Sequence, residues 1–217
     1  MSEAEKNTAR LFIISAPSGC GKGTLIAELN KRFDVYNSVS CTTRPPREGD
    51  KDGVQYFFVT SERFDELVSE DGFLEHAEFG DNKYGTPKKP VEENLAAGRD
   101  VLLEIEPQGA FQVKAKRPDA VSLFILPPSV ASIERRLRRR AVDSGETEAQ
   151  IQRRLKTVVP DIKRAYEYDY VMVNDDLDKA IGDLLTIYRL SKEGGAGLEK
   201  FTAAAMKTTI DEVLENA

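Results

Sequence analysis

The chain has 217 residues, of which 40% are hydrophobic, and its formal net charge is −6. This acidic balance argues against a general binder of nucleic acids or of membrane surfaces, since both carry negative charge themselves. The length suits one large α/β domain or a core domain with insertions. Two cysteines, Cys20 and Cys41, form no metal-binding pattern and predict a reducing, cytoplasmic compartment. We expect neither a signal peptide nor a membrane-spanning segment, because the longest apolar runs are only as long as strands.

The first predicted element is an apolar strand at 11–14, followed by a glycine-rich loop and a helix-like segment at 25–29. Gly19 and Gly21 let the loop curl so that successive N–H groups point into one cavity, and Lys22 adds a positive charge. A strand, such a loop and a helix form the arrangement that binds nucleotide phosphates. The alternative is a plain glycine-rich turn. The predicted phosphate-binding residues are Ala16, Pro17, Ser18, Gly19, Cys20, Gly21, Lys22, Gly23 and Thr24.

The loop departs from the strict phosphate-loop pattern at both ends. That pattern begins with glycine and places serine or threonine directly after the lysine. This chain has Ala16 and Gly23 at those positions, and its hydroxyl comes one residue later, at Thr24. Because the missing hydroxyl is the usual direct ligand of Mg²⁺, we expect phosphates, water and a carboxylate from elsewhere in the chain to hold the metal.

Residues 36–90 have a different character, with short strand-like runs and few helix signals. Within them, 54–59 and 73–79 read as strands, and 62–70 reads as a helix that follows a Thr-Ser cap. A short helix after them ends at Gly98.

Further along, buried strands alternate with helices, and this alternation predicts a parallel sheet. For the last helix, which follows a flexible glycine-rich linker, two alternatives stay open: packing on the core or self-association. The predicted strands are 101–105, 121–126 and 170–173, and the predicted helices are 130–142, 147–168, 177–190 and 198–215.

Two groups of arginines predict an anionic ligand. Arg44 and Arg47 lie three residues apart on a proline-stiffened segment, and guanidinium groups bind phosphate bidentately. Arg136 and Arg140 share a helix face, where their repulsion would be relieved by a polyphosphate, and Arg154 can approach from the next helix. The alternatives are a solvated loop in the first case and a basic surface paired with nearby acidic residues in the second.

Glu75 lies in an alternating run and is expected to share an apolar face with Phe73, Ala77 and Phe79. A carboxylate on an apolar face is costly unless something pairs with it. The N1–H and N2–H₂ donors of a guanine base would satisfy it bidentately. A salt bridge to a neighbouring arginine is the alternative.

With these motifs in this order, residues 10–190 resemble guanylate kinases of the bacterial type. The resemblance implies transfer of the γ-phosphoryl group of ATP to GMP, with Mg²⁺. It also implies an α/β P-loop three-layer fold with a central parallel sheet, an inserted mixed β/α GMP-binding region and a helical lid. The residues that carry it are the loop 16–24, the segment 40–47, Tyr56, Glu75, 84–86, 104–109, Arg136, Arg140, Arg154, 168–170 and 174–176.

The resemblance implies a role for each matching residue. Lys22, Arg44, Arg136, Arg140 and Arg154 would be catalytic. The loop 16–24 would bind the ATP phosphates, with Asn174 near the adenine, and Thr24 or Glu106 is the candidate for direct contact with Mg²⁺. The GMP-binding residues would be Ser40, Arg44, Arg47, Tyr56, Glu75, Tyr84, Thr86, Glu104 and Glu106.

Glu106 stands where this family usually has aspartate, so its carboxylate is one methylene further from the backbone.

Two other functions stay open: a catalytically inactive guanylate-kinase-like binding module, and a kinase for another nucleoside monophosphate. Small molecules are the expected partners, with no nucleic acid and no membrane, and a homo-oligomer stays open. The implied parts are a core domain of 10–35, 99–130 and 156–190, a GMP-binding region of 36–98 and a lid of 131–155. Outside the resemblance, we expect an appended helix in 191–217.

Overall fold

A computed structural model describes residues 9–217 of the chain, without the side chains of Phe79, Asp143 and Ser144. The fold is α/β, as the sequence predicts, with two sheets. The strand order is β2-β7-β1-β8-β9 in a five-stranded sheet and β4-β3-β6-β5 in a four-stranded sheet. The chain forms two compact units, and the first division between them along the chain falls within β1. The first unit holds the described residues up to Ile13 together with 34–120, and the second holds 14–33 and 121–217.

The elements alternate between strands and helices along most of the chain. β1 spans Leu11–Ser15. The first unit also holds β2 Val35–Asn37, β3 Cys41–Thr42, β4 Phe57–Phe58, α2 Ser61–Ser69, β5 Phe73–Phe79, β6 Asn82–Pro87, α3 Lys88–Ala96, β7 Asp100–Glu104 and α4 Pro107–Lys116. The second unit holds α1 Lys22–Asn30, β8 Val121–Leu126, α5 Val130–Ser144, α6 Glu148–Lys163, η1 Arg164–Glu167, β9 Tyr170–Val173, α7 Leu177–Lys192, η2 Glu199–Phe201 and α8 Lys207–Glu215.

The five-stranded sheet is built from apolar strands. Every residue of β1 is buried, and β8 is buried from Ser122 onward. Such continuous burial is typical of parallel strands, whose two faces are both covered. β2 pairs in parallel with β7, with Val35 opposite Asp100, and β8 pairs in parallel with β9, with Leu123 opposite Tyr170. None of the described helices has the length and apolar character that a membrane crossing requires.

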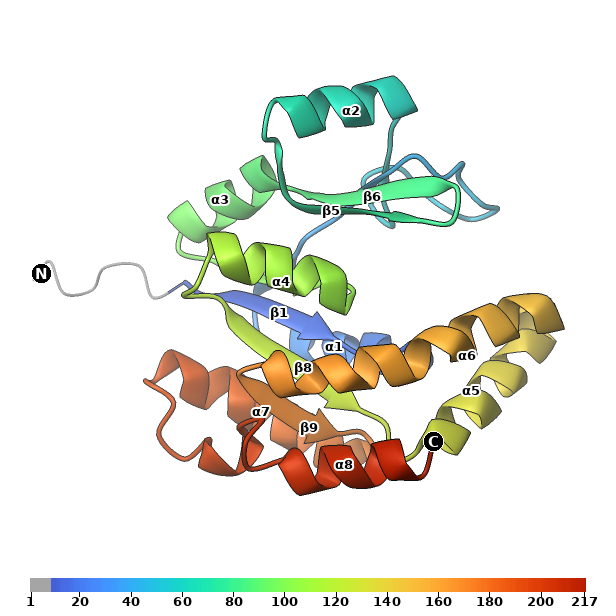
Figure 1. Ribbon diagram of the computed structural model, residues 1–217. Coiled ribbons are helices and arrows are strands. Elements are labelled where there is room, and N and C mark those ends of the chain that lie inside the picture. The colour runs from blue at the N-terminus through green and yellow to red at the C-terminus, as the bar shows by residue number, and fades with distance from the viewer. Residues whose placement is uncertain (1–8) are drawn as a thin grey trace, which may run out of the picture. The chain divides into compact units, whose positions relative to one another are not determined.

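Helix α2 covers one face of the four-stranded sheet (Figure 1). Thr60 caps the helix, because its hydroxyl accepts a hydrogen bond of 3.2 Å from the N–H of Arg63. Phe64 packs against Phe73 with ring centroids 4.7 Å apart, and Cys41 belongs to the same buried cluster. Burial of one such ring contributes about 2 kcal/mol to the packing of this short helix on the sheet.

A register shift between Phe73 and Glu75 interrupts the alternation of β5. Phe73 faces α2, because its ring packs on Phe64, and it shares this face with Gly85, where an added Cβ would lie 2.9 Å from the ring. Glu75 bonds to Thr86, the next residue of β6, and therefore points to the opposite face. The predicted common face of Glu75 and Phe73 is wrong, because a bulge inserts an extra residue and turns the side chains beyond it. Ala77 does lie on the face of Glu75, and the side chain of Phe79 lies outside the described part of the chain.

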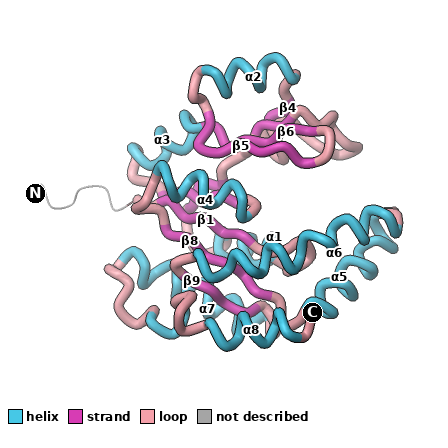
Figure 2. Tube along the Cα trace, in the orientation of Figure 1, coloured by secondary structure: helices cyan, strands magenta, loops and turns pink. Residues whose placement is uncertain are grey.

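The second unit contains two consecutive helices, α5 and α6, that lie against each other (Figure 2). α5 is longer than predicted and ends where Gly145 adopts a left-handed conformation, with φ of 68°. Thr147 and Gln150 form a capping box that begins α6. The single helix predicted at 147–168 is divided, because a 3₁₀ turn replaces the α-helix after Lys163.

The C-terminal segment packs on α6 and η1 within the second unit. Ile210 and Val213 of α8 are buried, and the hydroxyl of Tyr166 donates a hydrogen bond to Asp211. Packing on the core is thus the alternative that the structure shows for this segment. The helix is shorter than the predicted 198–215, because a 3₁₀ turn and a loop precede it.

Candidate functional site

The predicted phosphate-binding loop connects β1 to α1. Gly19 and Gly21 have φ of 85° and 86°, which lies in the left-handed region that favours glycine. A Cβ at Gly21 would lie 2.6 Å from Nδ2 of Asn174, so the position also has no room for a side chain. Lys22 begins α1, at the helix end that carries partial positive charge. The local geometry therefore suits an anion.

Two side chains from distant parts of the second unit bond to this loop. Nδ2 of Asn174 donates to the carbonyl of Cys20 at 2.7 Å. Nη1 of Arg136 donates to the same carbonyl at 3.3 Å, and its Nη2 donates to the carbonyl of Asn174 at 3.2 Å. Sequence reasoning placed Asn174 near the adenine and missed this bond to the loop, for which the sequence carries no signal.

The arginines Arg140 and Arg154 share one acidic partner. The carboxylate of Glu146 forms ion pairs with Nη2 of Arg140 at 3.1 Å and with Nη2 of Arg154 at 2.7 Å. Nη1 of Arg154 also donates to Oγ of Ser18, in the phosphate-binding loop, at 2.8 Å. The structure thus brings Arg136 and Arg154 to the loop, while Arg140 reaches Glu146. Arg138, on the same helix, pairs with Glu148 at 2.6 Å, as the basic-surface alternative expects.

Cys20 contributes packing to the loop. Its thiol donates to the carbonyl of Ile125 at 3.4 Å. Burial raises the pKa of this thiol to about 12, against the opposing charges of Arg136 and Lys22. The group therefore stays protonated near neutral pH and is a poor nucleophile.

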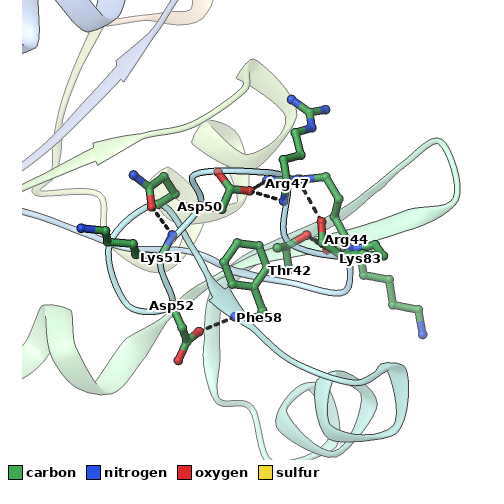
Figure 3. A network of polar contacts seen from close by, with 10 residues as sticks. Thr42, Arg44, Arg47, Asp50, Lys51, Asp52, Phe58 and Lys83 are labelled. Atoms are coloured by element: carbon green, nitrogen blue, oxygen red, sulfur yellow. Dashed lines mark hydrogen bonds and ion pairs between the residues drawn. The ribbon is translucent and has the colours of Figure 1, made fainter.

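The first unit holds the other predicted arginines, on the loop after β3 (Figure 3). Nη2 of Arg44 pairs with a carboxylate oxygen of Asp50 at 2.8 Å, and the N–H of Arg47 donates to the same oxygen at 2.9 Å. These contacts hold the pKa of Asp50 below its usual value, the bond from Arg47 contributing most. Arg47 is exposed, and its guanidinium makes no ion pair among the described residues. The loop is therefore ordered around Asp50 and presents a cation to solvent.

Aromatic rings lie next to Arg44, on the face of the four-stranded sheet that carries the side chain of Tyr84. Its guanidinium lies 5.4 Å from the ring centroid of Tyr56 and 5.7 Å from that of Phe58. The rings of Tyr56 and Tyr84 are 5.8 Å apart. Burial raises the pKa of Tyr56, so its hydroxyl stays a hydrogen-bond donor. Ser40 is half-buried next to these residues, where its carbonyl accepts from the N–H of Phe57 at 2.9 Å.

Glu75 and Thr86 form a buried polar pair on the same face. Oγ1 of Thr86 donates to Oε1 of Glu75 at 2.6 Å. Glu75 is 6% exposed and Thr86 is fully buried. Burial raises the pKa of Glu75, while the bonds from Thr86 act in the opposite direction. Glu75 makes no ion pair within the described chain, so the predicted alternative of a salt bridge to an arginine is wrong.

Glu104 is the last residue of β7 and Glu106 lies two residues beyond it, and both are exposed. Glu106 lies directly before α4, and the helix begins with Pro107. Neither residue is covered by the protein, so both can reach a ligand. The sequence predicted both residues as site residues, but it did not predict the helix that follows them.

The described residues include no group of three or more histidine, cysteine, aspartate or glutamate side chains placed to hold a metal ion. Thr24 is exposed in the first turn of α1, and a Cβ at Gly23 would meet nothing within 4 Å. Thr24, in the second unit, offers one hydroxyl oxygen, and Glu106, in the first unit, offers a carboxylate. Each residue by itself suits a Mg²⁺ ion that takes most of its ligands from phosphates and water.

Comparison with known proteins gives consistent matches. A family model described as guanylate kinase matches residues 8–190. A guanylate kinase of Thermus thermophilus is 47% identical over 211 residues, which cover 94% of each chain. A guanylate kinase of Escherichia coli is 49% identical over 185 residues, which cover 84% of this chain and 88% of the relative. A crystal structure of guanylate kinase from Anaplasma phagocytophilum has a TM-score of 0.67 and 34% identity, and the match covers 86% of this chain and 88% of that one.

Proposed function

The chain belongs to the guanylate kinase family, and we propose that it transfers the γ-phosphoryl group of ATP to GMP to give GDP and ADP. The observation that carries this proposal is the buried pair of Glu75 and Thr86, which lies on the sheet face that also carries Arg44 and Tyr84. A buried carboxylate without a cationic partner is costly to keep ionised. A base with two adjacent donors would repay that cost.

Guanine supplies these two donors at N1–H and N2–H₂. An ionised carboxylate has about four acceptor positions, so the bond from Thr86 leaves room for both. Adenine has a lone pair at N1 where guanine has a donor, so an acceptor would face the carboxylate of Glu75. We therefore assign base recognition to Glu75 and Thr86, and the phosphate of GMP to Ser40, Arg44, Arg47, Tyr56 and Tyr84.

The transfer step needs alignment and charge neutralisation more than covalent catalysis. Lys22 and the loop N–H groups would hold the phosphates of ATP, as their place at the start of α1 supports. Arg136, Arg140 and Arg154 would neutralise the charge of the transferring group. The bond of Arg154 to Ser18 supports this assignment, because it brings a lid arginine to the loop that binds phosphate.

Mg²⁺ would enter as the complex with ATP, and its charge would offset that of the β- and γ-phosphates. Thr24 and Glu106 are the residues of this chain that would contact it, directly or through water. The division into a core, a GMP-binding region, a lid and an appended helix stays a proposal, as does localisation in the cytoplasm.

A substrate panel tests the proposal. Turnover is measured by a coupled assay for ADP, with ATP and Mg²⁺ held constant and GMP, AMP, CMP and UMP compared at equal concentrations. We expect GMP to be preferred by at least about two orders of magnitude, because a mismatched base leaves Glu75 buried and unpaired. A preference for another monophosphate would contradict the roles of Glu75 and Thr86. Binding of GMP with no turnover on any monophosphate would favour the inactive binding module.

A further inference from the structure

β5 is the edge strand of the four-stranded sheet, so one side of its backbone has no strand partner. Helix α4 runs beside that edge (Figure 2). The side-chain amide of Gln112 pairs with the backbone of His76 in both directions: Nε2 donates to its carbonyl at 2.9 Å, and Oε1 accepts from its N–H at 3.2 Å. Nζ of Lys116 donates to the carbonyl of Phe73 at 3.1 Å. The helix thus supplies hydrogen bonds that another strand would normally make.

Gly109 lies on the same face of α4 as these two residues, since positions 109, 112 and 116 follow the spacing of helical turns. A Cβ built on Gly109 would lie 2.6 Å from Oε2 of Glu75 and 3.0 Å from its Cδ. The backbone of Gly109 has no positive φ, so its conformation does not require glycine. The need for glycine at position 109 therefore comes from the nearby carboxylate of Glu75.

We propose that α4 is a positioning element for base recognition and that the missing side chain of Gly109 sets the place of the Glu75 carboxylate. Oε1 of Glu75 is held by Thr86, and Oε2 lies against the backbone of Gly109. Gln112 and Lys116 fix the helix to the strand that carries Glu75, so the distance between Gly109 and Glu75 cannot relax easily. This inference rests on the proposed function, because it takes guanine to be what Glu75 binds.

A methyl group at position 109 would push Oε2 away or tilt the carboxylate about the bond from Thr86. Either movement misaligns two acceptors that must meet two donors of the base. We expect Gly109→Ala to raise the Kd and the KM for GMP by about tenfold or more, since each bond to a charged acceptor is worth about that factor. The KM for ATP should change less than twofold.

The chain offers a matched control in Gly182, within α7. A Cβ at Gly182 would meet nothing within 4 Å, and its φ is not positive. Gly182→Ala therefore adds the same methyl group to a helix without a neighbour to displace. Both substitutions raise helix propensity, so thermal unfolding should show Gly182→Ala to be at least as stable as the wild type. The GMP constants of this control should equal those of the wild type.

A double variant makes the test specific to the carboxylate. Glu75→Asp withdraws the carboxylate by one methylene, so adding Gly109→Ala to it should cost GMP binding less than it costs in the wild type. Equal losses in both backgrounds would overturn the inference and indicate a general distortion of α4. If Gly109→Ala alone fails to fold while the double variant folds, rescue of folding by the shorter carboxylate replaces this comparison and supports the close contact between position 109 and Glu75. If neither variant folds, a role of Gly109 in the fold of α4 replaces the positioning role.

Calorimetric titration with GMP, without ATP, separates this inference from the proposed function. If the wild type does not bind GMP, the proposed function fails, and the inference fails with it. If the wild type binds GMP and Gly109→Ala binds it equally well, the positioning role is overturned and the proposed function stands. A raised Kd for GMP in Gly109→Ala, with Gly182→Ala unchanged, supports both.

Discussion

The hydroxyl of Thr86 donates a 2.6 Å hydrogen bond to Oε1 of Glu75, and both side chains are buried. Opposing effects act on the carboxylate. Burial disfavours its charge, while the bonds from Thr86 favour it, and the net result is a pKa above the usual value. Thr86 therefore both orients the acceptor and helps to keep it ionised.

Replacement of this hydroxyl tests both effects. Thr86→Val keeps the shape of the side chain and removes its donor, so we expect the KM for GMP to rise by about tenfold or more. Thr86→Ser keeps the hydroxyl and should come within a few-fold of the wild type. Steady-state kinetics at saturating ATP provide the measurement. Equal constants for the two variants would contradict the role of the hydroxyl.

The raised pKa of Glu75 also predicts a pH dependence. Binding of guanine needs the ionised carboxylate, and this form is lost as the pH falls through a pKa above 4.5. We expect the KM for GMP to rise as the solution becomes mildly acidic, while the KM for ATP stays flatter. In Glu75→Gln the KM for GMP should be higher and should lack this acidic rise. A rise of the same size in both proteins would assign the titration to another group.

The raised pKa of Glu75 also affects stability, and here a rise in pH is unfavourable, whereas it favours GMP binding. Because the folded state holds the proton of Glu75 more tightly than the unfolded state, ionisation of Glu75 lowers the free energy of unfolding as the pH rises from 4.5 through the raised pKa. Glu75→Gln should remove this decline. Urea unfolding curves measured across that pH range, in the wild type and in Glu75→Gln, check this expectation.

Lys22 lies at the start of α1, where its charge would add to that of the helix end. We expect Lys22→Ala to lower kcat by several orders of magnitude, because the charge acts on phosphates in the transition state, and to leave GMP binding nearly intact. Lys31→Ala is the control, because this lysine lies just after the other end of α1 and pairs with Glu28 at 2.5 Å. A kcat within tenfold of the wild type for Lys22→Ala would contradict the phosphate-loop assignment.

Gly23 is a position where a hydroxyl can be introduced without a steric conflict, since a Cβ there would meet nothing within 4 Å. Gly23→Ser places an oxygen ligand directly after Lys22, and we expect the concentration of Mg²⁺ needed for half-maximal rate to fall. Gly23→Ala adds the carbon without the oxygen and so separates the effect of the added ligand from that of the added Cβ. The same Mg²⁺ requirement in both variants would show that Thr24, Glu106 and water already complete the coordination.

The parts of the fold that the sequence predicts well are those with long regular patterns. β5, β8 and β9 lie at their predicted bounds, and α5 and α7 lie within two residues of theirs. Each of these elements carries enough apolar or periodic residues to dominate its local environment. The phosphate-binding loop is equally local, because its glycines, its lysine and the flanking elements are contiguous.

Features that depend on tertiary contacts were harder to predict. Helix α4 contains Gly109, a poor helix former, and its hydrogen bonds to β5 do not show in its own sequence. The bulge of β5 moved Phe73 off the face of Glu75, because register depends on the partner strand. The bond from Asn174 to the carbonyl of Cys20 joins residues 154 positions apart.

The central claim is that the terminal phosphate of ATP moves to GMP, and one labelling experiment tests it most directly. The protein is incubated with ATP labelled in its γ-phosphate, Mg²⁺ and GMP, and the products are separated. The account predicts that the label appears in the β-phosphate of GDP, in equal amount to the ADP formed. It also predicts that the label stays in ATP when GMP is omitted. Label released as inorganic phosphate at the same rate with and without GMP would contradict the account.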